Sequence, residues 1–118
     1  MTADRDDKPM GHVVYFTLKD PSAANIDKML SACRKYLSNH DGTVFFAVGT
    51  RAAAYTREVN DQEFHVSLHL VFENSAAQDN YQEHPEHTKF ITECKDMWAK
   101  VRVFDDFVVG MTFSGGNG

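Results

Sequence analysis

The sequence predicts a single α+β domain. Its 118 residues suit one hydrophobic core rather than two. Four segments alternate in the manner of strands, and two longer segments repeat apolar residues at helical spacing. With 42% hydrophobic and 25% charged residues, the composition is that of an ordinary globular protein, so the order of the segments carries the fold prediction.

The first strand and the first helix follow one another closely. Residues 12–19 alternate, and one face carries His12, Val14, Phe16 and Leu18. Asp20 followed by Pro21 is typical of a helix start, with Asp20 as the N-cap. A helix of about four to five turns follows from the apolar positions Ile26, Met29, Leu30, Cys33 and Leu37.

The second and third strands are joined by a long polar connection. Asp41-Gly42 ends the first helix in a turn, and residues 43–49 alternate as a strand that is apolar on both faces. Residues 50–63 are mostly polar, and we expect this connection to be mobile. In residues 64–73 one face carries Val66, Leu68, Leu70 and Phe72, and the other carries His65, Ser67, His69 and Val71.

Two helices and a strand complete the pattern. Ser75 and Gln78 have the form of a capping box, which predicts a short helix over residues 76–81. Pro85 opens a longer helix with an apolar stripe of Phe90, Ile91, Cys94, Met97, Trp98 and Val101, and residues 101–109 form the last strand. The order β-α-β-β-α-β is the ferredoxin-like motif, with both long helices on one face of an antiparallel sheet.

The second face of this sheet is too apolar to stay exposed. It is expected to carry Val13, Tyr15, Phe45, Ala47, Val71 and Phe107. No apolar segment is left to cover these side chains, whereas two identical sheets can pack face to face. The sequence therefore predicts a homodimer; an exposed apolar patch is the alternative.

The net charge and the cysteines indicate which partners and which cell compartment are expected. Twelve Lys and Arg against 17 Asp and Glu give a net charge of −5, which disfavours nucleic acids and anionic membranes as partners. No segment approaches the length of a membrane span, and the N-terminus lacks signal-peptide order. Cys33 and Cys94 lie on helical apolar stripes and are expected to be buried thiols in a cytoplasmic protein. We expect a disordered tail over residues 1–10, a domain over 11–109 and a flexible tail over 110–118.

The segment Tyr-Gln-Glu-His-Pro-Glu-His, residues 81–87, holds the candidate chemistry. His87 lies in the first turn of the helix opened by Pro85, so its ring faces the core and tends to stay neutral. A neutral imidazole accepts protons, and Tyr81 can donate a hydrogen bond to it or to a substrate. Alternatively, His84 caps the helix and His87 packs at the core edge. A metal bound by His12, His84 and His87 is a further alternative, which the spacing does not favour, and we predict no metal and no cofactor.

Several motifs together resemble those of a known family. They are His12 leading an apolar strand, Val48-Gly49, Leu70-Val71-Phe72-Glu73, Tyr81-x-x-His84-Pro85-x-His87 and Val103-Phe104-Asp105. The chain is similar in these positions to the stress-responsive α/β-barrel (Dabb) family of the dimeric α+β barrel superfamily. The resemblance implies a ferredoxin-like fold whose two sheets form a barrel across a homodimer.

The resemblance also implies roles for individual residues. A plant polyketide cyclase of this family closes a ring by aldol condensation without a cofactor. By similarity to it, His87 is the catalytic histidine, Tyr81 assists it, and His12 lines the pocket. Val66 occupies the place of a further pocket histidine, and we expect His84 and Phe90 to be ligand-binding residues as well.

Three hypotheses follow. The first is a homodimer that binds a small apolar or aromatic molecule between sheet and helices. The second is a cofactor-independent enzyme, related to polyketide cyclases or quinol-forming monooxygenases, with His87 as general base. The third is a structural module whose core is filled beside His87.

Overall fold

The computed structural model describes residues 8–113. Its elements, in chain order, are β1 (Met10–Leu18), α2 (Ala23–Leu37), β2 (Thr43–Thr50), β3 (Val66–Phe72), α3 (Ser75–Glu83), α4 (Pro85–Cys94), a 3-10 turn (Lys95–Met97) and β4 (Trp98–Phe107). The predicted order β-α-β-β-α-β is confirmed, including the extra short helix before the second long one.

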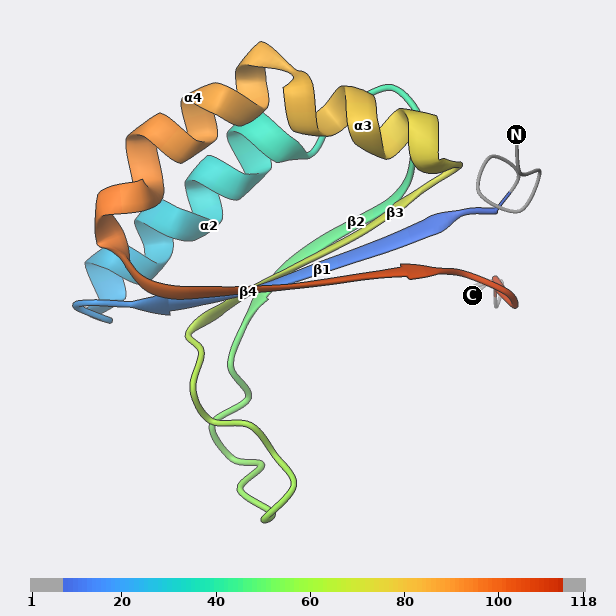
Figure 1. Cartoon of the computed structure of the whole chain (residues 1–118). Coiled ribbons are helices and arrows are strands. Elements are labelled where there is room, and N and C mark those ends of the chain that lie inside the picture. The colour runs from blue at the N-terminus through green and yellow to red at the C-terminus, as the bar shows by residue number, and fades with distance from the viewer. Residues whose placement is uncertain (1–7, 114–118) are drawn as a thin grey trace.

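The four strands form one antiparallel sheet in the order β2-β3-β1-β4. All three helices lie on one face of this sheet, and the long connection between β2 and β3 extends on the opposite side (Figure 1). This arrangement leaves the sheet with a covered helical face and an open face.

The core lies between the sheet and the helices. The strand alternation predicted for β1 and β3 is confirmed, because Val14, Phe16, Val66, Leu68, Leu70 and Phe72 are all buried on the helical face. Met29, Cys33 and Leu37 of α2 and Phe90 and Cys94 of α4 close the core from the other side. Cys33 and Cys94 are both unpaired and buried.

Two helices begin at different capping residues from those predicted. Ser22, not Asp20, is the N-cap of α2, since its hydroxyl accepts a hydrogen bond from the Asn25 amide at 3.2 Å. Asn74, not Ser75, caps α3 by accepting from the Ala77 amide at 2.9 Å. In both places two good capping residues lie close together, so residue type alone does not select one of them.

The last helix is shorter than predicted, and Trp98 belongs to a strand. α4 ends at Cys94, and Trp98 opens β4 opposite Leu18 of β1. Its indole packs against Phe16 and Phe90 at ring-centroid distances of 5.2 and 5.7 Å. Helical spacing predicts Trp98 in the core, whereas the structure shows it partly buried and packed against the core from a strand.

The open face carries the apolar side chains predicted for it, with one exception. Phe107 pairs with Met10 and so shares the helical face, because directly paired residues project to the same side. Phe104 pairs with Val13 and occupies the open face instead. Phe45 and Phe104 are 50% and 53% exposed, so large aromatic groups of this face are left without cover in the single chain.

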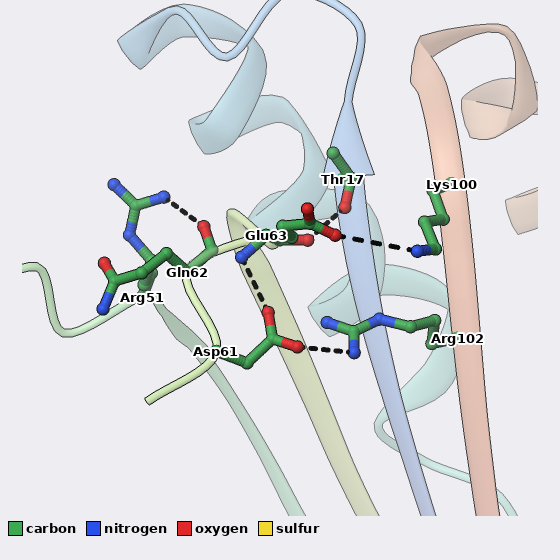
Figure 2. A network of polar contacts seen from close by, with 7 residues as sticks. All are labelled: Thr17, Arg51, Asp61, Gln62, Glu63, Lys100 and Arg102. Atoms are coloured by element: carbon green, nitrogen blue, oxygen red, sulfur yellow. Dashed lines mark hydrogen bonds and ion pairs between the residues drawn. The ribbon is translucent and has the colours of Figure 1, made fainter. Parts of the chain in front are cut away.

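The connection over residues 51–65, which we call the arm, makes polar contacts with the sheet. Arg102 of β4 donates a hydrogen bond to Asp61 at 2.8 Å, and Lys100 lies 3.7 Å from Glu63 (Figure 2). The Thr17 hydroxyl of β1 donates to the Glu63 carbonyl. The polar residues of the arm supply these contacts, and the mobility expected from the sequence stays a prediction.

The strand β1 begins two residues before the predicted start. Met10, assigned from the sequence to a disordered tail, pairs with Phe72 on one side and Phe107 on the other. The rest of that tail up to residue 7, and residues 114–118 of the C-terminal tail, lie outside the described residues. Within residues 8–113, no helix has the length and apolar character needed to cross a membrane.

Candidate functional site

A cavity of about 440 Å³ lies between the helical face of the sheet and the helices α3 and α4. His12, Tyr81, His87 and Asp105 are its titratable lining residues. The apolar part of the wall comes from Val14, Phe16, Leu37, Leu68, Phe90, Ile91, Trp98, Val101 and Val103, and Gln78 and Gln82 complete it. The volume is within the range of small-molecule sites, about 300–1,000 Å³.

His12 is held in place by a carboxylate from the neighbouring strand. Its Nδ1 lies 2.6 Å from Oδ1 of Asp105, which is opposite it in the pairing of β1 with β4. An ionised carboxylate can only accept hydrogen bonds, so Nδ1 carries the proton that is donated to Asp105. With Nδ1 as the donor, the Nε2 atom of His12 faces away from Asp105 as the second ring nitrogen available for a hydrogen bond.

Tyr81 of α3 lies among the histidines of the site. Its ring centroid is 4.9 Å from that of His87 and 5.8 Å from that of His12. The hydroxyl group is buried and has no hydrogen-bond partner among the described residues. Burial, with a smaller contribution from Cys33, raises the pKa of Tyr81, so the phenol stays protonated and is a hydrogen-bond donor.

His87 lies in the first turn of α4, where Pro85 occupies the first helical position. The ring is half-buried beside Phe90 and Ile91 in the wall of the cavity. Burial, followed by the proximity of His12 and His40, lowers the pKa of His87, so its imidazole is neutral at pH 7. A neutral imidazole in an apolar wall has the properties of a general base.

The structure brings together four of the six residues expected in the site. His12, Tyr81, His87 and Phe90 all line the cavity. His84 does not: it caps α4, with its Nδ1 accepting a hydrogen bond from the Glu86 amide at 3.0 Å. Val66 is fully buried in the core and is absent from the cavity wall, where Leu68 represents β3.

Among residues 8–113, no three His, Cys, Asp or Glu side chains are grouped so that they could hold a metal ion. The groups in the cavity wall that can exchange protons are the imidazoles of His12 and His87, the Tyr81 phenol and the Asp105 carboxylate.

The family model described as Stress responsive A/B Barrel Domain (Dabb) matches residues 10–108. The chain belongs to this family. The match covers β1 to β4 without interruption, and the resemblance seen in the sequence motifs is confirmed. No curated protein matches the chain by sequence.

Solved structures agree with this assignment. A Dabb family protein with a ferredoxin-like fold from Mesorhizobium loti is 25% identical, covers 87% of this chain and 99% of its own, and superposes with a TM-score of 0.72. A dimeric ferredoxin-like protein from Thermobifida fusca gives 0.72 at 14% identity, covering 86% and 92% of the two chains. Hydroxynitrile lyase from Passiflora edulis gives 0.70 at 19% identity, covering 92% and 99%. At these identities the similarity establishes the fold, and the ferredoxin-like prediction is confirmed.

Two residues of the cavity wall, Asp105 and Gln78, are not predicted as site residues by the sequence. Asp105 appeared only within a family motif, and its contact with His12 spans 93 residues of sequence. Gln78 was considered only as part of a capping box, although its buried side chain lines the cavity and its Oε1 atom has no hydrogen-bond partner among the described residues. Gln78 lies three residues before Tyr81 on α3, so helical spacing could have placed both on one face.

Proposed function

We propose that this Dabb protein binds a small apolar or aromatic molecule in the cavity beside His12, Tyr81 and His87. The observation that carries the proposal is an apolar space of about 440 Å³ with a few polar groups concentrated in its wall. Sites of this composition bind through apolar contact and use the polar groups to orient the ligand. The cavity supports this proposal over the third hypothesis from the sequence, a core filled beside His87.

The binding proposal is testable by titration. We would follow amide chemical shifts by NMR while adding 4-propylphenol, indole and 4-phenyl-2-butanone in separate experiments. We expect saturable shifts for residues of the cavity wall with at least one of them. Val103→Trp, which narrows the cavity from β4, should weaken binding about tenfold or more, whereas Val44→Trp on the other edge strand should not. Lack of saturable shifts with all three compounds, or equal effects of the two variants, would overturn the proposal.

We propose in addition that the protein is a homodimer formed through the open face of the sheet. The half-exposed Phe45 and Phe104 and the partly exposed Val13, Tyr15 and Val71 give this face its apolar character. The similar protein from Thermobifida fusca is described as dimeric, which supports the same arrangement here. Sedimentation velocity at micromolar concentration tests it: Phe104→Lys should dissociate the dimer, and a monomeric wild-type protein would refute it.

A second candidate function is cofactor-independent proton transfer. It is favoured by the neutral His87 imidazole and by the His12–Asp105 pair on the same cavity. In this reaction His87 takes a proton from a carbon next to a carbonyl group, and the enolate is reprotonated from solvent. Deuterium uptake by 4-phenyl-2-butanone in D₂O, followed by proton NMR, should be faster with wild type than with His87→Gln. Equal rates for both proteins and for buffer would leave binding as the function.

We propose a reducing compartment, such as the cytoplasm, for this protein. Cys33 and Cys94 are unpaired and inaccessible in the core, as is usual for proteins that fold under reducing conditions. Imaging of the tagged protein in its own cells would test this location.

A further inference from the structure

The arm, residues 51–65, is held on the side of the sheet that no helix covers. Figure 1 shows it extending away from the sheet on the side opposite to the helices. Asp61 accepts hydrogen bonds from Arg102 at 2.8 Å and from the Glu63 amide at 2.7 Å, which links the arm to β4 (Figure 2). Arg51 donates to the Gln62 carbonyl at 2.9 Å and closes the base of the arm. The arm therefore has a defined shape before any partner binds.

The arm and the open face together form a second hollow, of about 480 Å³. Its aromatic wall consists of Tyr15, Tyr55, Phe64 and Phe104, and its polar wall includes Arg51, Asp61 and Arg102. The rings of Tyr15 and Phe64 are in edge contact at 4.9 Å, so the arm continues the apolar surface of the sheet.

Two large apolar side chains of the arm are mostly exposed in the single chain. Tyr55 is 65% exposed and Val59 is 81% exposed. An arm that only closed a turn would not require exposed apolar groups. Their position beyond an apolar sheet face is typical of an interface.

Two cations on the open face, Lys100 and Arg102, are paired with carboxylates before association. Lys100 and Arg102 lie on this face of β4, and the arm carboxylates of Glu63 and Asp61 neutralise them. Burying an isolated charge is costly, whereas a charge already paired and hydrogen-bonded can be buried at much lower cost. This pairing suits a face that is to be covered by a mostly apolar surface, such as the same face of a second copy.

We infer that the arm is part of the interface between two copies of this chain, with Tyr55 and Val59 packing on the partner. The inference rests on the proposed dimer. Because the arm projects from the face through which the copies meet, each arm lies beside the other copy's sheet when the two faces join. The arm thus extends the interface beyond the sheet.

The test combines a dissociation constant with a direct contact measurement. The double variant Tyr55→Ser/Val59→Ser should raise the dimer dissociation constant about tenfold or more, measured by sedimentation across a concentration series. Val109→Ser is the matched control, because Val109 is 86% exposed and lies outside the arm. In a 1:1 mixture of isotope-labelled and unlabelled wild-type protein, filtered NOE spectra should show contacts from the Tyr55 ring to the other copy.

The outcomes separate this inference from the proposed dimer. A monomeric wild-type protein would refute both. The role of the arm would be overturned by two results together in a dimeric wild type. The Tyr55 ring would give no contact to the other copy, and the arm variant would dissociate no more than Val109→Ser. The dimer itself would stay in place. The NOE measurement uses wild-type protein, so it does not depend on how the variants fold.

Discussion

Replacing Tyr81 by phenylalanine should stabilise the protein and weaken its ligand binding. The side chain is 1% exposed, and its ring packs against Phe72 and His87 at centroid distances of 4.8 and 4.9 Å. Phenylalanine keeps this packing and removes a buried hydroxyl that has no hydrogen-bond partner within residues 8–113. A buried polar group left unsatisfied costs about 1–3 kcal/mol.

The expected gain in the free energy of unfolding is about 1 kcal/mol, at the low end of that range, because removing the oxygen leaves a small void. For a domain of this size that gain raises the melting temperature by about 3–5 °C. Urea unfolding of wild type and Tyr81→Phe measures the difference. Protein concentration must be equal in both, since the stability of a dimer depends on it.

The same substitution should reduce affinity for a ligand with a carbonyl acceptor. Because burial raises the pKa of Tyr81, the hydroxyl is protonated and can donate. Loss of one such hydrogen bond corresponds to about 0.5–1.5 kcal/mol, or an affinity lower by about 2–10-fold, measured by titration with 4-phenyl-2-butanone. Tyr36→Phe is the control for both measurements, because Tyr36 is only partly buried and lies outside the cavity wall. A Tyr81→Phe protein that is less stable than wild type by about 1 kcal/mol or more would refute the reasoning, since the hydroxyl would then have a partner.

Three further predictions concern the cavity, the core and the turn after α2. Because the pKa of His87 is lowered in the folded state, the unfolded state binds the proton first as pH falls below about 6.5. Wild type should lose stability over that range, and His87→Gln should lose less, as urea unfolding at pH 7 and pH 5 would show; equal losses would contradict the burial of the ring. Burial raises the pKa of Cys33 to about 12 and of Cys94 to about 11, so iodoacetamide at pH 8 should label neither thiol until the protein is denatured. Gly42 has φ of +86°, and a Cβ there would lie 2.5 Å from the Cβ of Ala77, so Gly42→Ala should lower the free energy of unfolding by about 2 kcal/mol or more; a change below about 0.5 kcal/mol would show that the turn adapts.

The sequence predicts the faces of the inner strands well because burial there follows a strict period of two. His12 and Leu68 were assigned to the helical face from alternation alone, and both are buried there. The ends of helices follow a weaker rule, since Ser22 and Asn74 compete with equally suitable neighbours and the choice depends on hydrogen bonds of about 1 kcal/mol.

Alternation within one strand does not predict which residues of two distant strands pair, and the site depends on such a pairing. Asp105 meets His12 only because β4 pairs with β1 in one particular register. The same register moves Phe107 to the helical face and Phe104 to the open face, which is why the prediction for Phe107 was wrong. A shift of one residue would exchange these positions.

A bulge in β4 makes this register possible. Leu18 pairs with Trp98 and Thr17 with Lys100, so Ala99 is an extra residue on β4. Strict alternation from Trp98 would place Asp105, seven residues later, on the opposite face. The bulge allows Trp98 to pack in the core while Asp105 still reaches the cavity.

Deleting Ala99 should therefore separate the packing of Trp98 against the core from the position of Asp105 at the cavity, which coexist in wild type. The shortened strand can keep Trp98 inside and turn Asp105 to the open face, or keep Asp105 and expel Trp98. Trp98 is the single tryptophan, so its fluorescence emission reports its burial while ligand titration reports the cavity. We expect one of the two signals to be lost in the deletion variant and both to persist in Ala99→Gly, which keeps the chain length. A deletion variant that retained wild-type emission and wild-type binding would show that the bulge does not determine the register of the site.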